Sequence, residues 1–200
     1  MTGTPIRRAT LPEVRVLAEL VAEAFEPLPV CQWLVPNPAE RRRILEDDFE
    51  ILVRHGVEHG VVYTTDDHTA VAVWYTGAPE GVPDIPDYDE RLLAACGVHT
   101  PRFQQLDEAM HKAHPLHAPH DHLALLAVGP RHQGAGLGAR LLDEHHAHLD
   151  RQGVPGYLEA SSPGSRALYL RHGYTDLDAP FGLPDGGPDP AMWPMWRDPR

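Results

Sequence analysis

The sequence has only one lysine, Lys112, among its 200 residues. It contains no Walker-type G-x-x-x-x-G-K-S/T loop, which excludes the nucleotide-binding mechanism that depends on that lysine. Schiff-base catalysis is disfavoured as well, because Lys112 lies in the polar run 110–117 and not in the apolar pocket that activates a lysine. The G-x-S-x-G motif of serine hydrolases is also absent from the sequence.

Cysteine, positive charge and long apolar runs are scarce too. The two cysteines, Cys31 and Cys96, form no C-x-x-C motif, which predicts free thiols in a reducing compartment. A formal net charge of −12 disfavours nucleic acids and anionic membranes as partners and favours a cationic, amine-bearing one. No apolar run approaches the roughly 20 residues of a membrane span, and residues 1–10 lack the apolar centre of a signal peptide. We therefore expect a cytoplasmic protein.

A glycine-rich segment, residues 133–138 with the sequence QGAGLG, follows the apolar run 123–128 and precedes a helical stretch. Glycines allow consecutive backbone N–H groups to approach an anion. The N-terminus of the following helix adds unpaired amides and a positive dipole end. The segment therefore predicts a site for the pyrophosphate of a nucleotide-bearing ligand.

A dinucleotide is one candidate for this ligand. The segment also fits the fingerprint G-x-G-x-x-A from Gly134, and Glu159 lies about where its ribose-binding acid is expected. However, residues 129–133 separate the apolar strand from the first glycine, and only residues 160–200 follow Glu159. This remainder is too short for the further strand-and-helix units of a doubly wound sheet, which makes the dinucleotide the weaker alternative.

Several motifs within residues 122–174 share the spacing of one known superfamily. After a strand that ends at Val128, Gln133-x-x-Gly136-x-Gly138 matches the Q/R-x-x-G-x-G/A signature for acyl-coenzyme A. A second strand, residues 156–160, follows, and residues 168–174 (LYLRHGY) correspond to an L-Y-x-x-x-G-F ending. In these motifs the chain resembles the GNAT superfamily of acetyltransferases. The resemblance implies an α/β fold (α+β mixed) whose central mixed sheet, of about six to seven strands, is splayed in the middle and flanked by helices.

Shorter segments narrow this resemblance to one subgroup. They are residues 71–74 (VAVW), 132–138 (HQGAGLG), 153–155 (GVP) and 158–161 (LEAS), and Tyr169 with Arg171. In these segments the chain is similar to puromycin N-acetyltransferase-like enzymes. The similarity implies direct transfer of an acetyl group from acetyl-coenzyme A to a primary amine of a small molecule, as in antibiotic self-resistance or detoxification of a metabolite. A protein or peptide N-terminus as acceptor, and a non-catalytic acyl-coenzyme A sensor, remain as alternatives.

The resemblance also assigns residues to acetyl-coenzyme A. Main-chain groups at the end of the central strand would hold the pantetheine arm, and the glycine loop would hold the phosphates. Ser162 stands where many members of the family have a coenzyme-contacting asparagine, although capping of the helix that begins at Pro163 is favoured for it. The implied coenzyme-binding residues are Leu126, Ala127, Val128, Arg131, Gln133, Gly134, Ala135, Gly136, Leu137, Gly138, Ser162 and Tyr169.

The catalytic groups implied by the resemblance are one acid and one base. Tyr169 is the candidate general acid for the departing thiolate. His122 and Glu159 compete as the base: imidazole has the better intrinsic pKa near neutrality, whereas Glu159 matches the glutamate of the puromycin-like pattern. Strand alternation predicts that His122 shares a face with Leu126 and Val128.

Fourteen histidines raise the question of a metal site, above all in the run 111–122. Pro115 and Pro119 interrupt any helix that would align the first of these histidines, and metal sites usually add carboxylates or thiolates at defined spacing. We therefore expect no metal. The three histidines within residues 145–148 are expected at the surface or at the edge of the core.

The pattern of the whole chain predicts a single domain over residues 1–200. Residues 1–117 would supply N-terminal strands, helices and the wall for the acceptor, 118–178 the acetyl-coenzyme A core, and 179–200 a C-terminal loop and the last strand. The acidic loop 77–90 would either attract a cationic acceptor or, as is favoured, only add solubility. Prolines would keep residues 27–38 irregular, and a homodimer is compatible with this layout. We expect strands at 6–9, 60–64, 69–75 and 191–197 and helices at 11–25, 39–55, 88–96 and 101–113.

Overall fold

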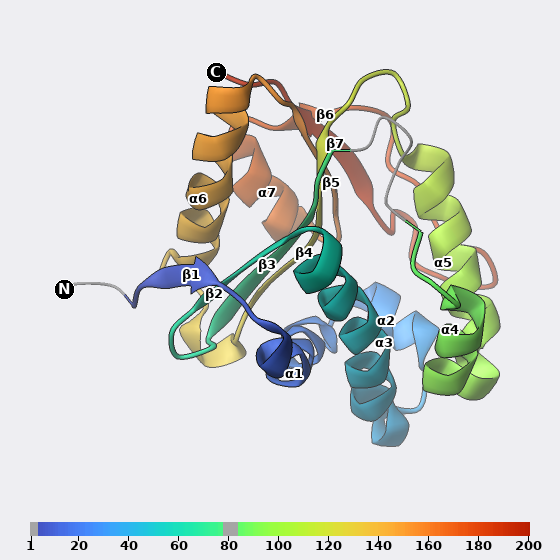
Figure 1. The fold of residues 1–200 in the computed structure, drawn as a ribbon. Coiled ribbons are helices and arrows are strands. Elements are labelled where there is room, and N and C mark those ends of the chain that lie inside the picture. Colours follow the sequence, from blue (N-terminus) through green and yellow to red (C-terminus); the bar gives the residue numbers. More distant parts are fainter. Residues whose placement is uncertain (1–3, 78–83) are drawn as a thin grey trace.

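The computed structural model describes residues 4–77 and 84–200, which form a seven-stranded sheet between two layers of helices (Figure 1). The strands are β1 Ile6–Arg8, β2 Val61–Thr65, β3 Ala70–Tyr75, β4 Asp121–Val128, β5 Gly156–Ala160, β6 Thr175–Asp176 and β7 Trp193–Arg197. Their order in the sheet is β1-β2-β3-β4-β5-β7-β6. This mixed α/β architecture confirms the fold class that the sequence predicts.

The two central strands, β4 and β5, pair in parallel, whereas the other neighbours in the sheet pair antiparallel. The parallel pairing runs only from Asp121 opposite Gly156 to Leu123 opposite Leu158. Beyond this point β4 continues to Val128 along β3, and β5 continues along β7. The central strands therefore diverge, and the predicted splay is confirmed.

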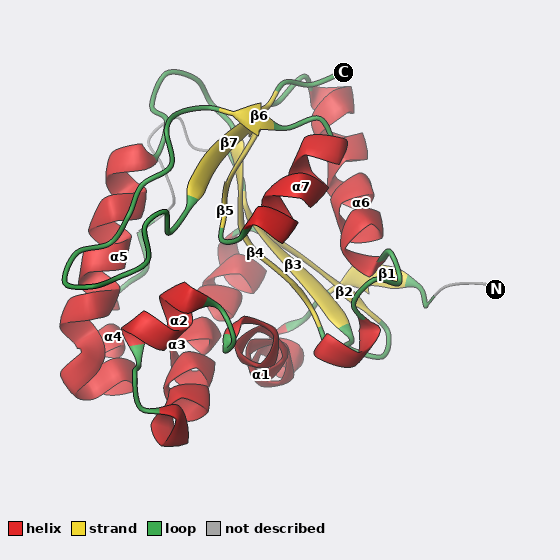
Figure 2. Ribbon diagram, turned by 180° about the vertical axis from the view of Figure 1, so that it is seen from behind, coloured by secondary structure: helices red, strands yellow, loops and turns green. Residues whose placement is uncertain are grey.

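Helices cover both faces of the sheet (Figure 2). On one face lie α6 (Leu137–Gln152) and α7 (Pro163–Arg171), and on the other lie α1 Val14–Phe25, α2 Pro29–Leu34, α3 Pro38–His59, α4 Tyr88–Cys96 and α5 Thr100–Ala113. Short 3-10 helices span Leu11–Glu13, Gly97–His99 and Pro130–His132. No helix of the described chain combines the length and the apolarity needed to cross a membrane.

Each helical layer covers its own hydrophobic core. The core beneath α1 to α4 includes Leu17, Leu45 and Leu125, and the core beneath α6 and α7 includes Leu142 and Leu158. Helix α1 reaches its core through a stripe of buried residues at helical spacing, as its sequence pattern predicts. The sheet thus separates two closed compartments, and access to the middle of the molecule depends on the gap between β4 and β5.

The prediction of an irregular segment at residues 27–38 is wrong for residues 29–34, which form α2. Pro29 occupies the first turn of α2, where its missing N–H would have no partner in any case. In the same way Pro38 opens α3, after Asn37, whose side-chain oxygen accepts the N–H of Ala39 at 3.1 Å. Proline therefore begins helices here instead of preventing them.

The register between β3 and β4 shifts at one residue. Val73 pairs with Leu125, but the next residue, Trp74, pairs with Leu123, which leaves Ala124 without a partner of its own. A bulge of this kind interrupts the alternation of side chains along the strand. Accordingly Ala124 and Leu125 both pack on the core beneath α1 to α4, whereas Leu123 packs on the other core.

The bulge changes the face on which His122 lies. Its partner in β3 is Tyr75, which belongs to the core beneath α1 to α4, whereas Leu126 and Val128 pack against the core beneath α6 and α7. The prediction that His122 shares a face with Leu126 and Val128 is therefore wrong. His122 faces α5, and the end of the same strand faces α6 and α7.

Candidate active site

The glycine-rich loop connects β4 to α6 at the open end of the central strands. Gly134 and Gly136 have φ angles of +77° and +80°, in the left-handed region that favours glycine. A Cβ atom at either position would meet no other atom within 4 Å, so the backbone is accessible from outside. Gly136 caps α6 without a side-chain hydrogen bond, and the first amides of a helix have no partner within it. This geometry suits an anion.

Two polar side chains of this loop have different surroundings. Gln133 donates a hydrogen bond from Nε2 to the carbonyl oxygen of Val128 at 3.1 Å, so it ties the loop to the end of β4. Arg131 is exposed and makes no hydrogen bond or ion pair with any residue that the structure describes. Arg131 is therefore the loop side chain that is available to a phosphate.

The end of β4 borders the gap between the central strands. Residues 126–128 pair with β3 on one side, and the pairing with β5 has already ended on the other. Gly138 of α6 lies where three elements converge: a Cβ there would be 3.6 Å from Leu168, 3.7 Å from Val128 and 3.9 Å from Leu126. The starts of α6 and α7 therefore approach the strand end closely and flank the gap.

His122 and Glu159 meet at the point where the strands begin to diverge. The Nε2 atom of His122 lies 2.8 Å from Oε2 of Glu159, and both side chains are buried, at 8% and 3% exposure. Tyr157, opposite His122 in the parallel register, donates its hydroxyl to Oε1 of Glu159 at 2.9 Å. The two candidates for the base are thus in contact and belong to one hydrogen-bonded group.

The charge on Glu159 determines which ring nitrogen of His122 donates a hydrogen bond. Burial raises the pKa of Glu159, but His122 and Tyr157 outweigh this effect, so the net pKa is lowered and the carboxyl is ionised at neutral pH. Because a carboxylate only accepts hydrogen bonds, His122 donates its Nε2–H to Glu159, which leaves Nδ1 as the second nitrogen of the ring. That Nδ1 atom is buried and has no hydrogen-bond partner among the described residues.

Three further side chains that the sequence did not lead us to predict surround this pair. The rings of His114 and Tyr157 lie 5.3 Å from that of His122, and His114 Nε2 is 3.2 Å from Nε2 of His120. Burial, followed by repulsion from His122, lowers the pKa of His114 to about 4, so its ring is neutral at physiological pH. Tyr157 had a recognisable signal, since it precedes Glu159 by two residues in the strand and must share its face.

Tyr169 lies on the opposite side of the sheet from this pair. It belongs to α7, is buried in the core beneath α6 and α7, and packs edge-on against Tyr174 at 5.8 Å between ring centroids. Burial raises the pKa of its hydroxyl, so Tyr169 keeps its proton at neutral pH. Tyr169 therefore lies in the core on one face of the sheet, whereas His122 lies on the other face.

Ser162 is the N-cap of α7, as favoured from the sequence. Its Oγ accepts the N–H of Ser165 at 3.1 Å, and Oγ of Ser165 accepts the N–H of Ser162 at the same distance. This reciprocal arrangement is a capping box. The hydroxyl of Ser162 is therefore engaged within its own helix, and its contact with a coenzyme stays a prediction.

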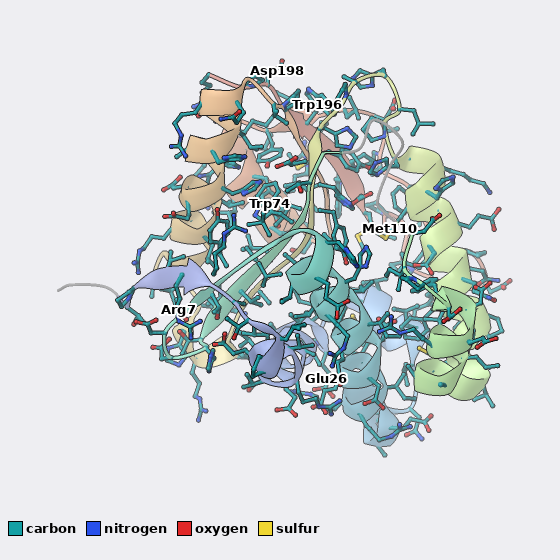
Figure 3. The ribbon with its side chains drawn as sticks, in the orientation of Figure 1. Arg7, Glu26, Trp74, Met110, Trp196 and Asp198 are labelled. Carbon is teal, nitrogen blue, oxygen red and sulfur yellow. The ribbon has the colours of Figure 1, made fainter. Side chains whose placement is uncertain are left out.

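A second buried histidine–carboxylate pair lies on the other face of β4. His145 of α6 is fully buried, its Nε2 lies 2.8 Å from Oδ2 of Asp121, and its ring stacks on Trp74 at 4.1 Å between centroids. Trp74 itself is labelled in Figure 3. His146 is also buried. The expectation that these histidines lie at the surface is wrong for both, because α6 turns this side of its helix toward the sheet, whereas His148 is exposed.

The histidine run 111–122 does not assemble into a group of metal ligands. Among the described residues, a different group has metal-binding donor atoms close together: Asp143, His146 and His172.

The acidic loop 77–90 lies only partly within the described residues, and Glu80 lies outside them. Of its other acids, Asp87 directly precedes α4.

Comparison with known proteins identifies the domain. Residues 113–182 match the family model of the acetyltransferase (GNAT) domain. Over these residues the chain is similar to the GNAT acetyltransferase domain, and the enzyme is an acyltransferase. The matched residues include the glycine loop, His122, Glu159 and α7.

The relatives that match most of the chain have low sequence identity to it. An uncharacterized N-acetyltransferase of Schizosaccharomyces pombe is 23% identical to this chain, over 84% of this chain and 73% of its own length. A Corynebacterium glutamicum structure described as histone acetyltransferase HPA2 and related acetyltransferase superimposes with a TM-score of 0.73 at 23% identity, covering 100% of this chain and 98% of that one. The PaiA N-acetyltransferase of Thermoplasma acidophilum, solved with coenzyme A, gives 0.59 at 10% identity, covering 98% and 99%.

Proposed function

We propose that this protein transfers the acetyl group of acetyl-coenzyme A to a primary amine of a small molecule. The observation that carries the proposal is the pair of His122 and Glu159, joined at 2.8 Å where β4 and β5 diverge. In this pair a carboxylate orients an imidazole whose second nitrogen is unpaired, which is the arrangement a general base requires.

Acetyl-coenzyme A would lie across the gap between the central strands. The pyrophosphate would be held by the amides of residues 134–138 and by Arg131, and the pantetheine arm would run along the main chain of residues 126–128. This placement is supported by the accessible backbone of Gly134 and Gly136 and by the end of the β4–β5 pairing at Leu123. A main-chain N–H of this strand end would polarise the thioester carbonyl.

The reaction would proceed by direct attack. Nδ1 of His122 takes one proton from the acceptor nitrogen as this nitrogen forms a bond to the thioester carbon, and Glu159 stabilises the resulting imidazolium. The C–S bond then breaks, and Tyr169 donates its hydroxyl proton to the departing thiolate. The products are the N-acetyl amine and coenzyme A, and the proton on His122 returns to the phenolate through solvent. No covalent acyl-enzyme is required.

The acceptor side favours a small cationic molecule. The base lies below the surface, which a compact acceptor reaches more easily than a folded protein does. The wall on this face also holds two buried carboxyl groups, Asp48 of α3 and Asp107 of α5; burial raises their pKa values to about 8 and about 6. A cation bound nearby would favour their ionised forms. The similarity to puromycin N-acetyltransferase-like enzymes supports an antibiotic or metabolite as the acceptor and a cytoplasmic location.

Release of free thiol from acetyl-coenzyme A tests the proposal when it is measured with a library of small primary amines and with peptides that have free N-termini. We expect thiol release with at least one small amine and little with the peptides. Release with peptides alone would indicate an N-terminal acetyltransferase instead. Calorimetric binding of coenzyme A without thiol release from any acceptor would indicate a sensor, and no binding of coenzyme A would refute both readings.

A further inference from the structure

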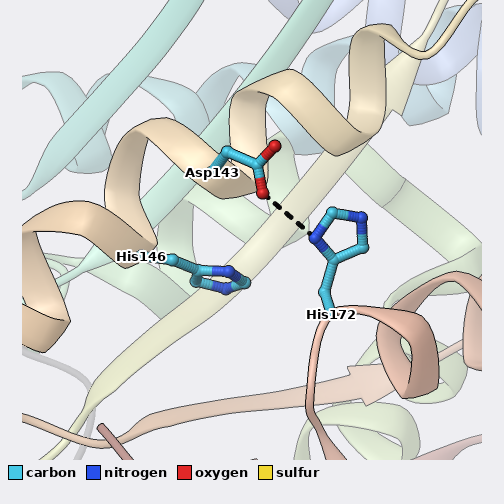
Figure 4. A group of neighbouring side chains, drawn as sticks. All are labelled: Asp143, His146 and His172. Carbon is cyan, nitrogen blue, oxygen red and sulfur yellow. Dashed lines mark ion pairs between the residues drawn. The ribbon is translucent and has the colours of Figure 1, made fainter. Parts of the chain in front are cut away.

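Three side chains with metal-binding donor atoms meet on the far side of the sheet from the proposed base (Figure 4). Asp143 and His146 lie three residues apart on α6, so they project from one side of the helix. His172 directly follows α7, and its Nδ1 lies 3.2 Å from Oδ1 of Asp143. One donor atom from each residue lies within 4.8 Å of the other two.

The state of these groups suits a cation. His146 is buried, and the ring of a neutral histidine has a lone pair that can bind a metal. Nε2 of His146 lies 3.1 Å from the hydroxyl of Tyr174. A partner of this kind on one ring nitrogen is what orients an imidazole whose other nitrogen binds a metal.

The charge next to the group does not oppose binding strongly. Arg197 is a cation that acts on His146, but both of its terminal nitrogens are bound to the carboxylate of Asp150, at 2.8 and 2.9 Å. Asp143 has an exposed side chain and can adjust its rotamer. In a tetrahedral zinc site the donor atoms lie roughly 3.4 Å apart. The Asp143 and His172 atoms already have this spacing, at 3.2 Å, and all three donor atoms lie within 4.8 Å of one another.

We propose that Asp143, His146 and His172 bind a divalent transition-metal ion, with two imidazoles and one carboxylate as ligands and water in the remaining position. Zinc suits this donor set and geometry, and it is the ion to test. The ion links α6 to the end of α7, the helix that carries Tyr169, and it lies away from His122 and Glu159. Its role is to hold the two helices together, and the proposal does not depend on the acetyl-transfer mechanism. It replaces the expectation, from the sequence, that the protein has no metal.

Zinc binding to the full chain, freed of metal with a chelator and then titrated calorimetrically with zinc chloride, tests this proposal. The variants are Asp143→Asn and His172→Ala, because both side chains are partly exposed and their loss leaves the core intact. His148→Ala is the matched control, since His148 lies exposed on the same helix. We expect one high-affinity zinc ion in the native chain and in the control, with affinity weakened by more than ~10-fold in both ligand variants. Zinc should also raise the melting temperature of the native chain and the control only.

Two results would overturn the proposal. One is the absence of a stoichiometric zinc site in the native chain, which would leave the contact between Asp143 and His172 as an ordinary surface ion pair. The other is a zinc site that survives both ligand variants, which would assign the ion to other histidines of this histidine-rich chain. Far-ultraviolet circular dichroism of each variant checks that a lost site does not reflect a lost fold.

Discussion

Two buried histidine–carboxylate pairs lie on opposite faces of β4, and they differ in location rather than in chemistry. Asp121 and His122 are neighbours in the strand; the first binds His145 and the second binds Glu159, each at 2.8 Å. In both pairs the histidine Nδ1 is buried without a hydrogen-bond partner among the described residues. A paired imidazole is therefore not sufficient evidence of a catalytic base.

What separates the two pairs is access to the gap between the central strands. His145 stacks on Trp74 in a closed core and links α6 to the sheet, and Asp121 also accepts the N–H of Gly77 at 3.2 Å. His122 instead binds Glu159, which lies beyond the last residue pair of β4 and β5, Leu123 opposite Leu158, where the strands part. We therefore interpret the pair at His145 as a structural link and the pair at His122 as the base. Matched substitutions in the two pairs can break or sharpen this distinction.

The largest effect is expected from His122→Gln. Glutamine can still donate a hydrogen bond to Glu159, but it has no basic nitrogen, so the variant separates proton transfer from packing. We expect kcat near pH 7 to fall by about 10²–10⁴-fold, with little change in the free energy of unfolding. The matched variant His145→Gln should keep kcat within about threefold. Equal losses of kcat in the two variants would contradict the distinction between the pairs.

The fold and the conformation of the glycine loop could be predicted from the sequence because their signals are local. The order of apolar runs, the spacing of Gln133, Gly136 and Gly138, and the Ser162–Pro163 cap each depend on a few neighbouring residues. Helix α2 was missed because proline signals both the interruption of a helix and its first turn, and the two cases differ only in the residues after the proline. The strand 156–160 and the helix 88–96 have the same bounds in the structure as in the sequence pattern.

The candidate site was predictable only in part. His122 and Glu159 were both recognised, yet their contact depends on the parallel register of β4 and β5, which no local pattern specifies. The face of His122 was predicted wrongly because a single bulge residue, Ala124, reverses the alternation beyond it. The burial of His145 and His146 depends on how α6 is rotated against the sheet, and polar residues on that side of the helix concealed this orientation.

The next largest effect is expected in the free energy of unfolding. Here His145→Gln should lose more than His122→Gln, the reverse of their order in kcat. His145→Gln loses the stacking contact with Trp74 and a hydrogen bond to a buried carboxylate, so we expect a loss of about 1–3 kcal/mol in the free energy of unfolding. Urea denaturation, with coenzyme A absent, measures the difference. His122→Gln should lose less, and a larger loss in that variant would indicate that His122 has the structural role.

The pH dependence of stability should separate the two pairs in a smaller but distinctive way. Burial, which outweighs the hydrogen bond to Asp121, lowers the pKa of His145 from 6.5. The unfolded chain then takes up this proton before the folded chain does, so stability is lost as the pH falls below 6.5. Glu159 also has a lowered pKa in the folded state, and its contribution is lost only as the pH falls below 4.5.

Denaturation curves over the acid and neutral range test this difference. His145→Gln should flatten the stability profile just below pH 6.5, and Glu159→Gln should flatten it only below pH 4.5. Identical profiles for the two variants would mean that the pairs titrate together. His114 and His146 also have lowered pKa values, so part of the loss below pH 6.5 should persist in His145→Gln.

The smallest effect is expected from Tyr157→Phe, which sharpens the comparison because the pair at His145 has no counterpart to this hydroxyl among the described residues. Tyr157 donates to Glu159 at 2.9 Å and favours its ionised form. Its removal should lower kcat by about 3- to 10-fold, which corresponds to the roughly 1 kcal/mol of one hydrogen bond. The acid limb of the pH–rate profile should also move to higher pH, because the carboxylate loses a stabilising donor. Tyr63→Phe, on the other face of the sheet, is the control and should leave both unchanged. An unshifted profile in Tyr157→Phe would show that Tyr157 only packs against His122.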